Sequence, residues 1–188
     1  MKKGKKNPKE EWLVKFINKN NLKLGVELGV QKGYNFKYLV ENTDDLVLHG
    51  VDIWSEKEVR WSGVSSDALE FQPSSVNSVF LDELKDWAKA YPDRVIFHRH
   101  FTNHAHTFYE AKSLDFVFID AGHEYEDVIV DIKCWKNKIK PGGWLMGHDI
   151  DQPQVRRAVR MMFGDHYSLA KQQKIWYIQR GHESIWTK

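Results

Sequence analysis

Short apolar runs alternate with amphipathic segments along most of the chain. Runs that predict strands lie at 24–28, 46–51, 94–98, 114–119 and 144–147, and segments with apolar side chains at helical spacing lie at 8–20, 34–41, 75–91, 103–111, 125–138 and 152–163. The alternation predicts an α/β fold built on a doubly wound, mostly parallel sheet. Two further segments, 167–170 and 174–179, predict a closing antiparallel hairpin, which brings the expected sheet to seven strands.

The first predicted strand ends in a glycine-containing turn, Glu27-Leu28-Gly29-Val30-Gln31-Lys32-Gly33. Gly29 allows a tight turn and a close approach to a ligand, because it has no Cβ atom. Gly33 lies where the free N–H groups of the next helix would face the same ligand. Glu27 adds an acceptor, which suits a ligand with a cationic or hydroxyl-bearing part. The alternative is an ordinary strand-to-helix turn, and the spacing differs from the G-x-G-x-x-G dinucleotide fingerprint.

Polar side chains also follow the other predicted strands. Asp52, with Ile53 after it, ends the second strand, and ligands bind at such strand ends in doubly wound sheets. Asp52 is positioned to accept both hydroxyls of a ribose, the alternative being an acid that caps the following segment. His148 and Asp149 follow the fifth strand. The convergence of polar residues at one edge predicts a site for a nucleoside-containing cofactor.

Asp120 directly follows the apolar run 114–119, and Gly122 then allows a turn that brings His123 back toward that carboxylate. A histidine can act as a general base near neutral pH, because its ordinary pKa is the closest of any side chain to 7. The alternative for His123 is a structural role, with its ring bonded to a backbone carbonyl. A purely structural role fits Asp120 less well, since it follows apolar residues onto an exposed rim.

These motifs together resemble class I S-adenosylmethionine-dependent methyltransferases, in the group that includes macrocin-type and other antibiotic-sugar O-methyltransferases. The resemblance covers about 23–149 and is carried by Glu27-x-Gly29-x-x-x-Gly33, Gly50-Val51-Asp52-Ile53-Trp54, Phe118-Ile119-Asp120-Ala121-Gly122-His123-x-Tyr125 with Asp131, and Pro141-Gly142-Gly143-x-x-x-Gly147-His148-Asp149. It implies a Rossmann-like methyltransferase fold and O-methylation of a sugar, glycan or other small-molecule hydroxyl.

The resemblance also implies the cofactor and its ligands. S-adenosylmethionine would be bound by Glu27, Gly29, Gly33, Asp52, Ile53, Thr102 and Asp120. Glu27 and Gly29 would border the methionine part, Asp52 would hold the ribose, and Thr102, within 101–103, would lie along the adenine. The catalytic residues would be His123 and Asp120, which would deprotonate the acceptor oxygen.

Several relatives bind a divalent cation through the acid after the fourth strand and two acids after the fifth. Those positions are Asp120, His148 and Asp149 in this chain. His148 departs from the acidic pattern, and Mg²⁺ prefers oxygen ligands, whereas histidine favours Mn²⁺, Fe²⁺ or Zn²⁺. A divalent cation, Mg²⁺ or Mn²⁺, is therefore an expectation that depends on the resemblance. It would lower the pKa of the substrate hydroxyl and orient it.

Composition narrows the class of protein. The 25 aromatic side chains, 8 Trp, 10 Phe and 7 Tyr, argue against a disordered chain, and 188 residues predict one domain, 9–188, after a flexible basic leader, 1–8. Five lysines of this leader region account for more than the formal net charge of +2, so the body does not predict a general nucleic-acid binder. No apolar run is long enough for a membrane span, and the single Cys134 fits a reducing, cytoplasmic location. The expected partners are a small-molecule or glycan acceptor and a second copy of the chain.

Other interpretations remain open at this stage. A nicotinamide-dependent oxidoreductase would need a dinucleotide turn that the chain lacks, while a cofactor-binding domain without catalysis, or a nucleic-acid methyltransferase, would share the fold. Further features without an assigned role are four clustered histidines, a basic helical segment and a long polar insertion. They comprise His98, His100, His104 and His106, which favour a zinc site only weakly; Arg156, Arg157 and Arg160, expected as a solvated face; and Trp54, Arg60 and Trp61, which could cover the acceptor.

Overall fold

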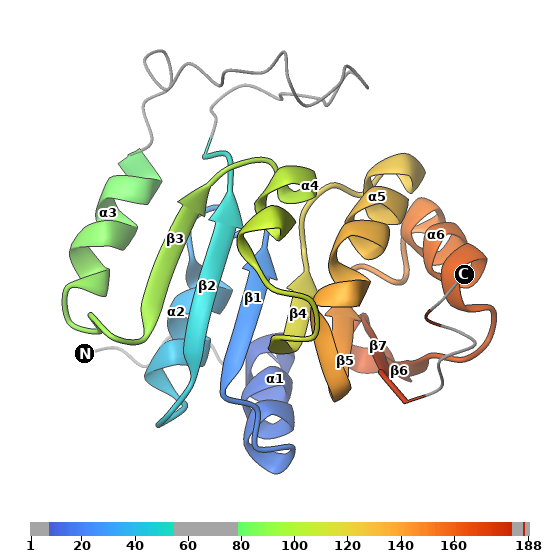
Figure 1. Ribbon diagram of the computed structural model, residues 1–188, viewed down its shortest axis with the longest axis horizontal. Helices are drawn as coiled ribbons and strands as arrows, with labels where there is room; N and C mark the ends of the chain where they lie inside the picture. The colour runs from blue at the N-terminus through green and yellow to red at the C-terminus, as the bar shows by residue number, and fades with distance from the viewer. Residues whose placement is uncertain (1–7, 55–78, 182–185, 187–188) are drawn as a thin grey trace.

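The computed structural model describes residues 8–54, 79–181 and 186 (Figure 1). In this part of the chain the strands form one seven-stranded sheet in the order β3-β2-β1-β4-β5-β7-β6. The strands are β1 (Leu24–Leu28), β2 (Val47–Asp52), β3 (Val95–Arg99), β4 (Leu114–Ile119), β5 (Ile139–Gly147), β6 (Ser168–Ala170) and β7 (Ile175–Gln179). Strands β1 to β5 are parallel, and β7 pairs antiparallel with both β5 and β6. The predicted doubly wound sheet with its antiparallel hairpin is confirmed.

Helices cover both faces of the sheet, with α4 and α5 on the near side and α1 and α2 behind it in Figure 1. The helices are α1 (Pro8–Lys19), α2 (Tyr34–Glu41), α3 (Val79–Ala88), α4 (Thr102–Ala105), α5 (Tyr125–Trp135) and α6 (Pro153–Phe163). One core joins α1, α2 and α3 to the sheet through residues such as Leu13, Phe36 and Leu84. The other joins α4, α5 and α6 through residues such as Ile132 and Val159.

The central strand β4 has apolar side chains on both faces, because helices cover both sides of it. Its one charged residue, Asp115, is near the start of the strand. The carboxylate of Asp115 accepts hydrogen bonds from the backbone N–H groups of Lys23, at 2.9 Å, and Leu24, at 2.8 Å, and it forms an ion pair with Lys140 at 3.0 Å. Asp115 therefore fixes the start of β1 beside β4, at the end of the sheet opposite the candidate site.

Four of the predicted elements differ by more than one residue from the structure. The predicted helix 75–91 ends at Ala88, and its first residues, 75–78, lie outside the described residues. The predicted helix 103–111 is a single α-helical turn, α4, followed by a 3-10 turn at 106–108, and the predicted helix 125–138 changes to 3-10 geometry at 136–138. The fifth strand starts at Ile139 rather than at 144. It contains a bulge, because the register with β4 shifts between the pairs Leu114–Ile139 and Phe116–Trp144. Gly142 accommodates this bulge with a φ of 81°.

Candidate active site at the carboxyl edge of the sheet

The carboxyl ends of the neighbouring strands β2, β1, β4 and β5 meet at one edge of the sheet. This edge carries Glu27 at the end of β1, Asp52 at the end of β2 and Asp120 directly after β4. His148 and Asp149 follow β5. Residues that are far apart in sequence are thus brought to the position where doubly wound sheets bind their ligands.

The glycine turn after β1 is packed tightly against the chain that follows β4. Gly29 has a φ of 85°, and a Cβ atom there would lie 2.2 Å from the carbonyl oxygen of Asp120. Gly33 has a φ of 72°, and its Cβ would lie 2.3 Å from a Leu84 methyl group in α3. Both glycines are required by the protein's own packing, since other residues rarely adopt such φ values and would also clash.

Asp52 holds the same turn by hydrogen bonds to backbone N–H groups. Its Oδ2 accepts from the N–H of Gln31 at 2.8 Å, and its Oδ1 accepts from the N–H of Trp54 at 2.6 Å. The indole of Trp54 donates to the carbonyl oxygen of Gln31 at 2.9 Å. Each carboxylate oxygen of Asp52 keeps a further lone pair, so the side chain can hold the turn and still accept a hydrogen bond from a ligand.

Trp54 belongs to the core beneath this turn. Its side chain is 5% exposed and makes an edge-on contact with Phe97, with ring centroids 5.7 Å apart. A role for this tryptophan as a movable cover is therefore not what the structure shows. The other two residues of that hypothesis, Arg60 and Trp61, lie outside the described residues.

Glu27 is buried, with only 2% of its surface exposed. Its Oε1 accepts a hydrogen bond from the Asn35 amide at 3.0 Å, while Oε2 is buried without a hydrogen-bond partner in the described part of the chain. Burial raises the pKa of Glu27 to about 8, although the Asn35 bond and the positive charge of Lys9 act in the opposite direction. A buried oxygen without a partner is costly, and a cationic ligand group at this position would satisfy it.

Asp120 forms an ion pair that the sequence did not suggest. Its Oδ2 lies 2.8 Å from the Nζ of Lys9, at the start of α1, and both side chains are largely buried. Burial by itself raises the pKa of Asp120, but His148 and Lys9 reverse this effect, so the net shift is downward. Asp120 is therefore an anion near neutral pH, and Lys9 balances part of its charge.

Two histidines flank Asp149. The Nε2 of His123 lies 2.8 Å from Oδ2 of Asp149, and the Nδ1 of His148 lies 3.1 Å from the same oxygen and 3.4 Å from Oδ1 of Asp120. The pKa of His148 is raised, because its contacts with the two aspartates outweigh the opposing effect of burial. The side chain of His123 is 46% exposed, so a solute can reach its ring.

The residues that could hold a cation include a histidine that the sequence-based set did not contain. Asp120, His123 and Asp149 each offer one ligand atom, and these atoms all lie within 4.8 Å of one another. His148, the histidine of the expected set, also lies beside both aspartates, at 3.4 Å from Asp120 and 3.1 Å from Asp149. A set of two carboxylates and one imidazole fits Mn²⁺, Fe²⁺ or Zn²⁺ better than Mg²⁺. The donors fit a divalent cation, although a cation would compete with the Lys9 ammonium for Asp120.

The two remaining expected cofactor ligands lie after β2 and β3. The carbonyl of Ile53 accepts a hydrogen bond from the side chain of Arg99 at 3.1 Å. The hydroxyl of Thr102 bonds to Asp131 of α5, and its carbonyl accepts from the indole of Trp135 at 2.9 Å. Thr102 thus anchors the chain after β3 to α5, and its hydroxyl has a protein partner.

The clustered histidines form an aromatic group rather than a metal site. His98 and His100 pack against Phe108, with ring centroids 5.3 and 4.9 Å away, and His100 stacks on His104 at 5.5 Å. Among the described residues, these histidines are not part of any group of three potential metal ligands. The weakly favoured zinc site has no support here.

Sequence reasoning missed Lys9 and Asn35. Lys9 is separated from Asp120 by 111 positions, and no local pattern distinguishes it from the neighbouring lysines. Asn35 lies in the first turn of α2, eight positions after Glu27. A polar residue on the otherwise apolar side of that short helix was the one available signal.

Comparisons with known proteins agree with this fold and site. Residues 26–150 match a family model described as a methyltransferase domain. The fold is similar to the O-methyltransferase NovP, with 19% identity, a TM-score of 0.63 and coverage of 92% of this chain and 78% of NovP. It is also similar to the calicheamicin methyltransferase CalS11, with 15% identity, a TM-score of 0.67 and coverage of 91% and 78%.

A methyltransferase from Geobacter sulfurreducens has 9% identity, a TM-score of 0.65 and coverage of 93% and 80%. No curated protein sequence matches the chain significantly. Within the described residues, no helix is long and apolar enough to cross a membrane. The matched segment contains the glycine turn, Asp52, Asp120 and Asp149, and the fold places all of them at one edge. The chain belongs to the methyltransferase-domain family and has the fold of class I S-adenosylmethionine-dependent methyltransferases.

Proposed function

We propose that the protein transfers a methyl group from S-adenosylmethionine to a hydroxyl oxygen of a sugar, glycan or other small molecule. The observation that carries the proposal is the convergence of Glu27, Asp120, His123 and Asp149 at the carboxyl edge. The likeness to NovP and CalS11 supports it at the level of the fold, and one CalS11 structure is described as a TDP-rhamnose 3′-O-methyltransferase.

The glycine turn and the ends of β1 and β2 would bind the cofactor. The unpartnered Oε2 of Glu27 would accept from the ammonium group of the methionine part, which also stabilises the charged form of this buried carboxylate. Asp52 would accept from the ribose hydroxyls with its remaining lone pairs. Ile53 and Thr102 would border the nucleoside, and Gly29 and Gly33 keep the turn in the shape that this arrangement needs.

His123 and Asp149 would supply the proton transfer. When Nε2–H of His123 donates to Asp149, its Nδ1 carries the free lone pair and can accept the hydroxyl proton. The acceptor oxygen then attacks the methyl carbon, and the C–S bond breaks to leave S-adenosylhomocysteine. Positioning accounts for much of the remaining rate, because the sulfonium is already activated. Asp149 stabilises the imidazolium, as does the nearby charge of Asp120.

Asp120, His123 and Asp149 would also be the ligands of a divalent cation. Such a cation would lower the pKa of the acceptor hydroxyl and orient it. His123 cannot be a metal ligand and a proton acceptor through the same nitrogen. A metal requirement would therefore assign His123 to binding and leave deprotonation to another group.

The decisive experiment is calorimetric titration of S-adenosylmethionine and S-adenosylhomocysteine into the wild type and the Asp52→Ala variant, with EDTA or with Mn²⁺. We expect micromolar binding in the wild type and a large loss in the variant. Parallel turnover assays with His123→Ala and sugar acceptors test the base. Absence of cofactor binding under every condition would refute the proposal, while binding of NADH instead would favour an oxidoreductase.

A further inference from the structure

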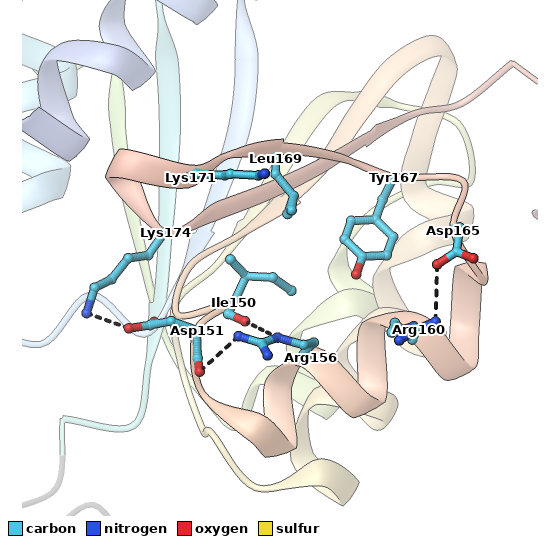
Figure 2. Close-up of a pocket in the computed structure, with 9 residues that line it drawn as sticks. All are labelled: Ile150, Asp151, Arg156, Arg160, Asp165, Tyr167, Leu169, Lys171 and Lys174. Atoms are coloured by element: carbon cyan, nitrogen blue, oxygen red, sulfur yellow. Dashed lines mark hydrogen bonds and ion pairs between the residues drawn. The ribbon is translucent and has the colours of Figure 1, made fainter.

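A separate hollow of about 390 Å³ lies between α6 and the β6–β7 hairpin (Figure 2). In this view Tyr167 and Leu169 point from the β6 side toward Ile150, while Arg156 and Arg160 come from α6. Its volume falls within the usual range of small-molecule sites. Its lining consists of Ile150, Asp151, Arg156, Arg160, Asp165, Tyr167, Leu169, Lys171 and Lys174.

The hollow carries an excess of positive charge. Two of its four cations are balanced by carboxylates, since Lys174 lies 2.7 Å from Asp151 and Arg160 lies 3.4 Å from Asp165. Within the described part of the chain, Arg156 donates to two neutral carbonyl oxygens, those of Ile150 at 3.1 Å and Asp151 at 3.3 Å.

Lys171 has no carboxylate partner in the part of the chain that the structure describes. The lining therefore has a formal charge of +2, from four cations and two carboxylates. This charge matches that of a phosphate monoester dianion. The guanidinium groups also have the fork geometry that binds phosphate oxygens in pairs.

The three arginines of α6 are all exposed to solvent, as the sequence suggested, but they have different neighbours. Arg156 and Arg160 are four residues apart and share the face that borders the hollow, as the helical period requires. Arg157 instead lies over the ring of Tyr125, with its guanidinium carbon 4.3 Å from the ring centroid. The structure thus selects two of the three arginines for the hollow.

The hollow is adjacent to the candidate active site. Its residues Ile150 and Asp151 directly follow Asp149, and the backbone N–H of Ile150 donates to the carbonyl of Lys174 at 3.1 Å. Consecutive Cα atoms are 3.8 Å apart, so the Cα atoms of Asp149 and Asp151 are separated by less than about 8 Å. The pKa of Lys174 is raised mainly by its hydrogen bond and ion pair with Asp151, and Asp149 adds a smaller contribution. The short segment Asp149-Ile150-Asp151 therefore links the candidate active site to the hollow.

We propose that this hollow binds the phosphate group of a phosphorylated small molecule through Arg156, Arg160, Lys171 and Lys174. Tyr167, Leu169 and Ile150 supply an apolar wall for the organic part that carries the phosphate. A second part of the proposal rests on the proposed methyl transfer: the phosphorylated molecule is the methyl acceptor, and its hydroxyl reaches the candidate active site. The binding site itself does not depend on that assignment.

The test is calorimetric titration of inorganic phosphate, glucose 1-phosphate and the neutral methyl glucoside into the full chain. Glucose 1-phosphate should bind, and its affinity should fall as NaCl is raised, because the cations are exposed to solvent. Arg160→Ala and Lys171→Ala should each weaken binding by about fivefold, as expected for an exposed charge contact. Arg157→Ala is the matched control on the same helix and should bind as the wild type does.

The relative affinities of glucose 1-phosphate and inorganic phosphate show whether the hollow binds a phosphorylated molecule or free phosphate. Tighter binding of glucose 1-phosphate than of inorganic phosphate supports a phosphorylated acceptor, and equal binding supports a site for free phosphate. Binding of neither phosphate, or equal weakening by Arg157→Ala and Lys171→Ala, would overturn the proposal. A titration of S-adenosylmethionine in the same samples separates this failure from failure of the proposed function, and thermal unfolding verifies that each variant is folded.

Discussion

Glu27 is buried and yet ionisable, so its effect on the free energy of unfolding at different pH values tests how the candidate site is built. Burial raises its pKa from 4.5 to about 8. A carboxyl group whose pKa rises on folding holds its proton more tightly in the folded state. Between pH 4.5 and 8 the folded protein therefore binds more protons here than the unfolded chain does. The free energy of unfolding must then fall as the pH rises through this interval, and the loss is complete above pH 8.

The size of the effect follows from the same values. One pKa unit corresponds to about 1.4 kcal/mol, so ionising Glu27 inside the ligand-free fold costs about 5 kcal/mol. Glu27→Gln keeps the shape and an oxygen for the Asn35 amide, at 3.0 Å in the wild type, but it has no proton to lose. We expect the variant to match the wild type near pH 5 and to be more stable by several kcal/mol at pH 9.

The assay is urea unfolding at pH values from 5 to 9, with Glu83→Gln on the exposed face of α3 as the matched control. The difference between Glu27→Gln and the wild type should grow with pH and should exceed the effect of Glu83→Gln, which removes an exposed carboxylate. Binding of S-adenosylmethionine should become weaker by about tenfold or more in Glu27→Gln, because a charged acceptor is lost. A stability difference that does not change with pH would refute the argument that this carboxyl group is buried and titrates upward.

Three further changes test other parts of the site. Gly29→Ala should lower the free energy of unfolding by roughly 2–5 kcal/mol in urea titrations, since a Cβ would meet the Asp120 carbonyl at 2.2 Å and φ is positive; an unchanged midpoint would contradict this packing. His123→Ala should reduce kcat for methyl transfer by about 100-fold or more while leaving cofactor affinity unchanged, and full activity would remove His123 as the base. Lys9→Met should tighten Mn²⁺ binding by about tenfold or more in calorimetry, because an ammonium no longer competes for Asp120 2.8 Å away; weaker binding would show that Lys9 assists the cation site.

The sequence by itself determined the strands and helices and the edge of the sheet at which the candidate site lies. Apolar runs of strand length such as 114–119, separated by amphipathic helices, can bury themselves only in a covered parallel sheet, so the fold class followed from the pattern. The position of Glu27, Asp52 and Asp120 at the ends of such runs also followed, because the carboxyl ends of parallel strands lie at one edge. Local turn chemistry was readable as well, since Gly29 and Gly33 both adopt positive φ values.

Local pattern could not define the elements whose limits depend on other strands. The bulge at Gly142 exists because β5 must pair with β4 on one side and with β7 on the other. The backbone N–H of Gly142 donates to the carbonyl of Arg180 at 2.7 Å, a partner that only the folded sheet supplies. The 3-10 turn that ends α5 leads into the same strand, and the periodicity of the sequence cannot distinguish it from α-helix.

Only the tertiary structure decided which polar groups meet. Lys9 and Asp120 are 111 positions apart, and their contact depends on how α1 crosses the sheet. His123, which follows β4, lies 2.8 Å from Asp149, which follows β5, and so it joins Asp120 and Asp149 in a group that could hold a cation. The packing of α6 likewise divides its arginines between Tyr125 and the charged hollow. The spacing of apolar residues and the turn glycines can be read from the sequence. Which side chains of different elements come into contact depends on how the helices pack on the whole sheet.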